Sequence, residues 1–424
     1  MNTLITNILQ LVTPRGDGPV KGSLMDRVSV QEHVSIRIEG GVIVEIAPQV
    51  DRHGIDLTID AGGAVVLPGL VDPHTHAVFA GTREEEFLSR LQGERYAEGG
   101  IQSTSRAVAA SSQKELVQGA LPRLQLMLEN GTTTVEIKSG YGLSLEGEIK
   151  LLLAIRQLRK TVPMRIVATF LGAHAFPSGV SREDYISTII TEMIPAVRRR
   201  RLAQFCDVFC DEGFFTVSET RTILRAARGA GLRLKLHADE LADVGGAELA
   251  ADLEATSADH LLRTSERGML RLREAGVIPV LLPGTAFTLG SPYAPARRMV
   301  DLDLPVALAT DFNPGTCLIY SMWIIIGLAV MKMGLTIEEA LTAATLNAAA
   351  ALELSNEVGS IEVGKRADLI LLDLENYRQI PYFFGHNPTR MVLHDGEVVY
   401  NGPIHEITMR GKPTSHEKAT SQLP

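Results

Sequence analysis

The chain has 424 residues, 45% of them hydrophobic and 21% charged, which is typical of a globular protein with one large domain and a smaller one. Its formal net charge of −9 argues against nucleic acid as a partner. Three cysteines are too few for a disulfide framework, so we expect buried free thiols and a cytoplasmic location. The longest apolar run, residues 322–331, is far shorter than the ~20 residues needed to cross a bilayer, and the N-terminus lacks the basic segment of a secretory signal.

The two ends of the chain both show patterns of short strands. Near the N-terminus, residues 34–46 alternate in polarity on either side of a Gly-Gly turn, which predicts a hairpin. Near the C-terminus, residues 367–400 repeat this style with one strand and a second hairpin. Neither set is sufficient for a stable sheet alone. We therefore predict a small β-sandwich domain that is assembled from residues 1–64 and 355–424.

The middle of the chain, residues 65–354, alternates short apolar strands with amphipathic helices, which indicates a parallel sheet. One helix start is marked by the capping pattern Ser181-x-x-Asp184. We interpret the basic run 198–201 as the end of that helix rather than a nucleic-acid patch, because cations there complement the helix dipole. Eight strands in about 290 residues predict an α/β fold, a (β/α)8 barrel. The strand candidates are residues 65–76, 132–139, 165–174, 206–213, 233–240, 257–261, 277–284 and 306–315.

The histidines gather where such a barrel places its active site, at the C-terminal ends of the strands. The chain has eleven histidines, and all five within the predicted barrel fall at or near a strand end. In His74-x-His76 both imidazoles point the same way from extended chain and can hold one metal ion. A bare His-x-His also occurs in surface turns, so this motif decides nothing alone. The five are His74, His76, His174, His237 and His260.

Carboxylates extend this pattern, since Asp311 follows the eighth predicted strand and the fifth ends in His237-x-Asp239-Glu240. Three imidazole nitrogens and one aspartate oxygen suit Zn²⁺ or Fe²⁺, with a position left for a water that becomes hydroxide near neutral pH. A carboxylate beside that water can carry its proton, and His260 can act as a second base or orient the water. Strand periodicity places Asp239 on the same face as His237. Glu240 can carry the proton only if the chain has already turned out of the strand into the loop at that point.

These residues resemble the metal site of the amidohydrolase superfamily, with Pro73-His74-Thr75-His76 after the first strand, His237-x-x-Glu240 at the fifth, His260 at the sixth and Asp311 at the eighth. The resemblance is to the mononuclear branch, because residues 207–213, at the end of the fourth strand, contain no metal-bridging lysine. It favours Glu240 over Asp239 as the residue that carries the proton. The metal ligands that it implies are His74, His76, His237 and Asp311.

Longer stretches resemble the imidazolonepropionase family within this branch, over residues 62–399. They are residues 80–87, 135–142, 170–174 and 310–315. The resemblance implies hydrolysis of the cyclic amide of 4-imidazolone-5-propanoate to N-formimidoyl-L-glutamate, the third step of histidine degradation, with one Zn²⁺, Fe²⁺ or Fe³⁺ ion per chain. On this substrate Arg83 can bind the propanoate carboxylate and His174 can donate to the ring carbonyl. The substrate-binding residues that it implies are Arg83, Tyr96, Tyr141, His174, Asn313, Gly315 and Thr316.

Two other functions stay open. A heterocycle deaminase would use the same metal ligands and release ammonia, and only the stretches around Arg83, Tyr141 and His174 favour ring hydrolysis over it. A non-enzymatic scaffold on the same fold would lose ligands, whereas this chain keeps all of them. Arg83 in a surface ion pair and Tyr141 as a packing residue are the alternatives to substrate contact. We expect a small-molecule substrate and no membrane partner, and the apolar segment around Trp323 permits a homodimer.

Overall fold

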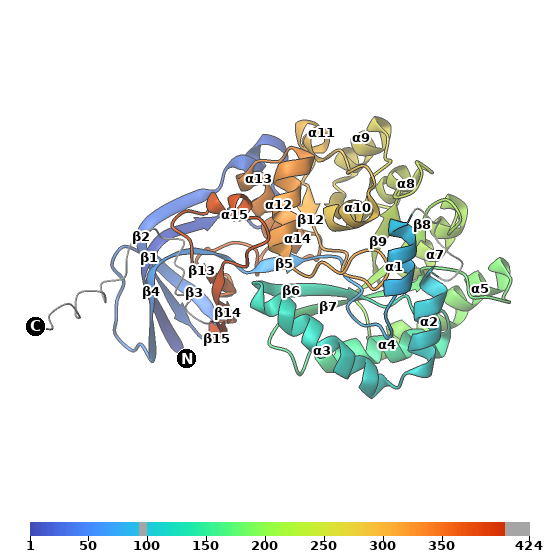
Figure 1. The fold of residues 1–424 in the computed structure, drawn as a ribbon, viewed down its shortest axis with the longest axis horizontal. Helices are drawn as coiled ribbons and strands as arrows, with labels where there is room; N and C mark the ends of the chain where they lie inside the picture. The colour runs from blue at the N-terminus through green and yellow to red at the C-terminus, as the bar shows by residue number, and fades with distance from the viewer. Residues whose placement is uncertain (93–99, 403–424) are drawn as a thin grey trace, which may run out of the picture.

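The computed structural model describes residues 1–92 and 100–402 and contains the predicted barrel. Eight parallel strands follow one another around it in chain order, and Figure 1 shows a second sheet at one end of the molecule. The ring is closed by hydrogen bonds from the Asp311 N–H to the His74 carbonyl (3.0 Å) and from the His76 N–H to the Phe312 carbonyl (2.8 Å). The barrel strands are β5 (Leu70–Asp72), β6 (Thr132–Lys138), β7 (Arg165–Ala173), β8 (Phe205–Cys210), β9 (Arg233–Ala238), β10 (Ser257–His260), β11 (Ile278–Leu281) and β12 (Ala307–Leu308).

The first predicted strand, residues 65–76, needs a correction. The last four residues of β4 (Leu57–Pro68) pair within the second sheet, and the barrel strand β5 begins only at Leu70. Gly69 lies between the two sheets at a point where a Cβ would overlap the Thr133 side chain. An all-apolar run is typical of any strand that is buried on both faces, so the sequence does not tell which sheet it joins.

Helices occupy the connections between the barrel strands. At the predicted cap of α5, the Ser181 hydroxyl accepts a hydrogen bond from the Asp184 N–H at 3.1 Å. A π-helical turn, Ile189–Met193, joins α5 to α6. The residue after α6, Arg201, adopts the left-handed conformation (φ 50°) and ends the helix. The α-helices are α1 (Glu84–Leu91), α2 (Gly100–Ala110), α3 (Gln113–Glu129), α4 (Leu145–Leu158), α5 (Arg182–Thr188), α6 (Ile194–Arg200), α7 (Val217–Gly229), α8 (Gly246–Asp252), α9 (Glu266–Ala275), α10 (Pro283–Leu289), α11 (Ala296–Asp301), α12 (Met322–Met333), α13 (Ile337–Ala344), α14 (Leu346–Ala350) and, beyond the barrel, α15 (Gln379–Tyr382).

The second sheet is mixed and takes its strands from both ends of the chain, in the order β15-β14-β13-β4-β1-β2-β3. The predicted β-sandwich is therefore one continuous sheet, which bends back so that Val42 bridges to Arg366. Its interior is apolar and includes the fully buried Ile5, Ile36 and Leu371. Besides β4, its strands are β1 (Asn2–Thr13), β2 (Ser29–Glu39), β3 (Val42–Ala47), β13 (Leu369–Leu372), β14 (Thr389–His394) and β15 (Glu397–Asn401).

An ion-pair cluster joins this sheet to the barrel, because Arg165 at the start of β7 contacts Asp368 (2.5 Å) and Asp395 (3.0 Å). All three cysteines are buried and free, as predicted. Among the described residues, no helix is long and apolar enough to span a membrane. The cytoplasmic location and the homodimer stay predictions.

Candidate active site

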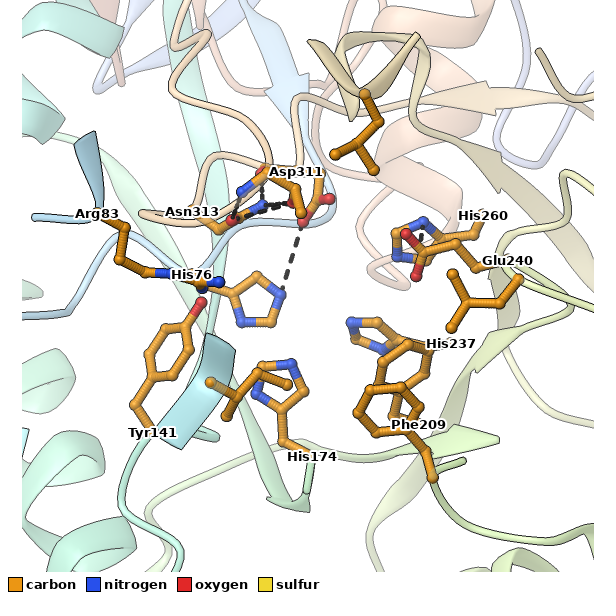
Figure 2. A pocket seen from close by; sticks show the side chains of 15 residues that line it. His76, Arg83, Tyr141, His174, Phe209, His237, Glu240, His260, Asp311 and Asn313 are labelled. Carbon is orange, nitrogen blue, oxygen red and sulfur yellow. Dashed lines mark hydrogen bonds and ion pairs between the residues drawn. The ribbon is translucent and has the colours of Figure 1, made fainter. Parts of the chain in front are cut away.

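A cavity of about 340 Å³ lies at the C-terminal ends of the barrel strands, and Figure 2 shows histidines, carboxylates and Arg83 around it. Most of the predicted site residues line it. Of the others, His74 is fully buried, Gly315 lies against Arg83, and Tyr96 falls outside the described residues. The cavity is lined by His76, Arg83, Ile101, Tyr141, His174, Phe209, Phe214, His237, Glu240, Leu241, His260, Leu289, Asp311, Asn313 and Thr316.

The four predicted metal ligands come together at the bottom of this cavity. The ring centroids of His74 and His237 are 4.5 Å apart, and those of His76 and His237 are 5.6 Å apart. Nε2 of His74 and Nε2 of His76 lie 3.6 and 3.7 Å from the same oxygen, Oδ1 of Asp311. The other oxygen of Asp311 accepts a hydrogen bond from the Thr285 hydroxyl at 2.5 Å, which fixes the carboxylate.

This arrangement fits a metal ion. Two ligand atoms that each lie about 2.0–2.1 Å from one tetrahedral ion are roughly 3.4 Å apart, close to the distances from the Asp311 oxygen. Nε2 of His74 is buried and has no hydrogen-bond partner among the described residues. Burial lowers the pKa of His74 and His76 well below the ordinary value, and the nearby ammonium of Lys138 adds to this effect. Both rings are therefore neutral, which is the form that binds metals.

A second layer of carboxylates orients two of these rings. Oδ2 of Asp259 lies 2.6 Å from Nδ1 of His74, and Oδ2 of Asp207 lies 2.9 Å from Nδ1 of His237. A carboxylate at Nδ1 keeps the ring proton there and leaves Nε2 as the ligand atom. This holds for His74. At His237 the carboxylate of Asp207 lies beside Nδ1 without hydrogen-bond geometry, and its other oxygen accepts the His237 backbone N–H at 3.1 Å.

Glu240, and not Asp239, faces the cavity. Asp239 adopts a left-handed conformation (φ 51°), so the chain has already turned when it reaches Glu240. The Asp239 carboxylate accepts hydrogen bonds from the Thr264 hydroxyl (2.8 Å) and the Gly246 N–H (2.9 Å). The Glu240 N–H is held by Asp211 at 2.7 Å, together with the next two N–H groups of the loop.

The surroundings of Glu240 favour its protonated form. Burial raises its pKa well above the ordinary value, and the nearby carboxylates of Asp311 and Asp211 raise it further. A cation held by Asp311 would oppose both effects and bring this pKa down. Nδ1 of His260 lies 3.6 Å from the Glu240 carboxylate, so this imidazole borders the same position.

The model of the amidohydrolase family matches residues 65–399. Imidazolonepropionases of Geobacillus thermodenitrificans and Alkaliphilus oremlandii are 48% and 47% identical to this chain, covering 92% and 93% of it and 96% and 97% of their own lengths. The chain belongs to the amidohydrolase family. Within the family it is similar over nearly its whole length to imidazolonepropionases, and it is a hydrolase.

Solved structures share the fold of this amidohydrolase at low sequence identity. A guanine deaminase from C. acetobutylicum with bound guanine has a TM-score of 0.71 and 16% identity, over 94% of this chain and 100% of that one. An adenosine deaminase from Xanthomonas campestris with bound zinc has a TM-score of 0.69 and 21% identity, over 93% and 92% of the two chains. These likenesses establish the fold alone.

At the other end of the cavity of this amidohydrolase, Arg83 is held from two sides. Glu86 accepts hydrogen bonds from its Nε at 2.8 Å and its Nη2 at 2.6 Å. Its guanidinium also lies directly over Gly315, where a Cβ would overlap it. Asn313 forms this turn by accepting the N–H groups of Gly315 (2.8 Å) and Thr316 (2.7 Å). Arg83 is thus buried in the cavity wall and is not part of a surface ion pair.

His174 and Tyr141 form another wall of the cavity. His174 stacks on His76 with the ring centroids 5.1 Å apart, and its Nδ1 lies 3.0 Å from the Gly140 carbonyl oxygen. Burial lowers the pKa of His174 to about 3. The ring is therefore neutral, its proton stays on Nδ1, and Nε2 carries a lone pair. The expected donation from His174 to the ring carbonyl needs correction, because this nitrogen accepts.

The loop that carries Tyr141 is fixed by a buried carboxylate that the sequence analysis missed. Glu148 accepts the N–H groups of Gly140 (3.0 Å), Gly142 (2.7 Å) and Leu143 (3.0 Å). Only the place of this acid in the first turn of α4 signals such a role. The turn around Tyr141 is therefore anchored, although its two glycines suggest a mobile segment.

The floor of the barrel is charged, and none of its residues is among the predicted site residues. Besides Asp72, whose carboxylate accepts hydrogen bonds from Thr310, two lysines and three acids lie inside the barrel strands with 0% exposure, and two of those three acids contact the predicted metal ligands. A signal existed, because a charged residue inside an otherwise apolar strand must face a polar interior or a charged partner. These residues are Glu136, Lys138, Asp207, Lys235 and Asp259.

Proposed function

We propose that this protein hydrolyses the cyclic amide of 4-imidazolone-5-propanoate to N-formimidoyl-L-glutamate, in histidine degradation. The observation that carries the proposal is one cavity with the His–Asp cluster at its bottom and a buried guanidinium in its wall. The cluster suits attack on an amide carbonyl, and the guanidinium suits the carboxylate of the propanoate tail. The imidazolonepropionases that the chain resembles over nearly its whole length support the same activity.

We assign one divalent or trivalent ion, zinc or iron, to His74, His76, His237 and Asp311. When bound, such an ion would supply hydroxide at neutral pH and polarise the substrate carbonyl. The roles of the protein are to keep the ligand nitrogens neutral and oriented, which Asp259 does for His74, and to exclude bulk water. The apolar wall formed by Phe209, Phe214 and Leu289 serves this exclusion.

Glu240 carries the proton in this mechanism. It takes a proton from the attacking water, whose oxygen forms a bond to the ring carbonyl carbon. It then gives that proton to the ring nitrogen as the C–N bond breaks. The second proton of the water is released to solvent, and the former ring carbonyl becomes the new carboxylate. His260, 3.6 Å from Glu240, orients the carboxylate between the two transfers.

The remaining wall residues hold the substrate in one orientation. Arg83 binds the propanoate carboxylate, while Glu86 fixes the guanidinium from its Nε side. Nε2 of His174 accepts a hydrogen bond from a ring N–H. Tyr141, beside His76 and His174, covers the ring. Asn313, Gly315 and Thr316 shape the turn under Arg83, and Tyr96 is assigned to the substrate by resemblance alone.

The test is an assay of the purified chain with 4-imidazolone-5-propanoate, combined with elemental analysis. We expect ring opening without ammonia, and one metal ion per chain. The Asp311→Ala variant should lose metal and activity together, because the site then lacks its only charged ligand. Ammonia release would favour the deaminase, and two ions per chain, or none in active protein, would contradict the assigned ligand set.

A further inference from the structure

The floor of the barrel is an ion network directly beneath the proposed metal site. Its five members are Glu136 and Lys138 from β6, Asp207 from β8, Lys235 from β9 and Asp259 from β10, all with fully buried side chains. Two lysines face three acids, so the network leaves one negative charge to be balanced. Burying so many charges is expensive, and apolar residues of similar volume would serve stability as well. Stability therefore does not explain why these charged residues are buried here, and we look for their role in the proposed metal site.

Lys138 occupies the branching point of this network. Its Nζ lies 2.8 Å from Oδ2 of Asp207, 3.4 Å from Oδ2 of Asp259 and 3.0 Å from Oε2 of Glu136. The same oxygen of Asp207 lies 2.9 Å from Nδ1 of His237. The same oxygen of Asp259 lies 2.6 Å from Nδ1 of His74. One ammonium group thus contacts both carboxylates that hold the two imidazoles.

We propose that Lys138 is a positioning residue that fixes the separation and orientation of His74 and His237, and so sets the affinity of the site for its metal. The inference rests on the proposed ligand set. Without the ammonium, two carboxylates that converge on one point would repel each other and turn away from the histidines. His74 would then lose the acceptor that fixes its ring, and His237 would lose the carboxylate beside its Nδ1 that also accepts its backbone N–H. The ligand nitrogens would no longer be held in place before the metal arrives.

The second lysine of the network provides a matched control. Lys235 is equally buried, and its Nζ contacts Oε2 of Glu136 (3.2 Å) and the Pro73 carbonyl (3.1 Å). Within the described part of the chain, no hydrogen bond or ion pair joins it to Asp207 or Asp259. A general need for buried lysines would therefore affect Lys138→Met and Lys235→Met alike. A role in holding the histidines would affect Lys138→Met more strongly, because Lys235 acts on Asp259 only through its charge and contacts neither carboxylate directly.

The experiment measures the Zn²⁺ dissociation constant of the metal-stripped full-length chain, by competition with a chromophoric chelator. We expect Lys138→Met to bind Zn²⁺ about 10- to 100-fold more weakly than the parent, the range for loss of a residue behind the ligands. Lys235→Met should weaken Zn²⁺ binding clearly less than Lys138→Met, because it leaves both contacts of Lys138 with Asp207 and Asp259 in place. Circular dichroism and thermal unfolding check that both variants are folded. If Lys138→Met does not fold, the double variant Lys138→Met/Glu136→Gln keeps the net charge of the network and should show the same weakening.

The outcomes separate this inference from the proposed function. A parent chain that binds one Zn²⁺, with Lys138→Met equal to it, would overturn the role of Lys138 and leave the function intact. Equal weakening in both lysine variants would also overturn it, because the effect would then be general. A parent chain that binds no Zn²⁺ would overturn the ligand set and this inference with it.

Discussion

The barrel and the second sheet both enclose buried side chains between strands, yet their interiors have opposite chemistry. The interior of the second sheet is formed by apolar residues such as Ile5, Ile36 and Leu371. The floor of the barrel holds charged groups, among them Lys138 and Asp259, with no exposure to solvent. The second sheet therefore buries apolar side chains, whereas the floor of the barrel buries charged ones.

This difference shows where stability and function reside. Each apolar side chain buried in the sheet stabilises the fold by roughly 1.5–3 kcal/mol, and the contribution is not directional. A buried ion network gains little net stability, since desolvation offsets the attraction, but it orients its members strictly. We therefore expect substitutions in the sheet to change stability alone, and substitutions around the barrel floor and cavity to change metal binding, catalysis or specificity.

The largest effect is expected for Glu240→Gln in the cavity. The amide keeps the shape of the side chain but cannot take a proton, so kcat should fall by about two to four orders of magnitude. Metal content should stay at that of the parent, because Glu240 is not an assigned ligand. Steady-state kinetics with elemental analysis measures both. A near-normal kcat would exclude Glu240 as the proton carrier.

In the second sheet, Ile36→Ala should destabilise the protein by about 2–5 kcal/mol, because it leaves a cavity in a fully buried position. Urea unfolding measures this loss. Under conditions where the variant is folded, its kcat and metal content should match those of the parent. A change in metal content would show that packing in the second sheet affects the metal site of the barrel. The separation of stability from function would then be wrong.

Substitutions of Arg83 in the cavity wall should change substrate binding, because its charge pairs with the propanoate of the substrate. Arg83→Ala should lower kcat/KM. The loss of transition-state stabilisation should be about 2–4 kcal/mol, within the range for truncating one partner of a buried, hydrogen-bonded charge pair. Arg83→Lys should recover only part of this loss, because an ammonium cannot replace the planar fork. Metal content should not change.

A substrate analogue without the propanoate provides the control for Arg83. It should react equally poorly with the parent and with Arg83→Ala, since neither then has the charge pair. If the parent handled the tail-less ring as well as the natural substrate, Arg83 would not bind the tail.

The sequence predicts most of the fold because the barrel strands are short, apolar and separated by helices. It fails between Val65 and Leu70, where one apolar run is divided between two sheets by Gly69. The residues on both sides of Gly69 are apolar and buried, whether they belong to the second sheet or to the barrel. Only the pairing partners, which are distant in sequence, decide the assignment.

For the site, the sequence predicts which residues gather but not how they are held. The choice of Glu240 over Asp239 depends on one left-handed residue, and strand periodicity has no information about it. The partner of Arg83 is Glu86, only three residues away, but a run of three glutamates does not tell which one pairs. Lys138 is the clearest signal without a prediction, because an ammonium at the end of a fully buried strand requires buried acids.

His174 should make the free energy of unfolding depend on pH, because its imidazole stays neutral inside the barrel. The apolar interior of the second sheet has no group that could do this. At about 3, the folded-state pKa of His174 lies below the ordinary value of 6.5, mainly because of burial. Its contribution to stability is therefore fully present above pH 6.5 and is lost as the pH falls toward 3, since only the unfolded chain takes up the proton. Relative to His174→Gln, the metal-free parent should lose about 2 kcal/mol between pH 7.5 and 5.0.

Urea unfolding of the metal-free chains at both pH values measures this difference. The stability deficit of Ile36→Ala against the parent should be the same at pH 7.5 and 5.0, because no proton binds at that position. The deficit of His174→Gln should instead shrink, or change sign, at the lower pH. If both deficits were independent of pH, His174 would be protonated to the same extent in the folded and unfolded chain. The neutral, accepting Nε2 that we assign to substrate binding would then be wrong.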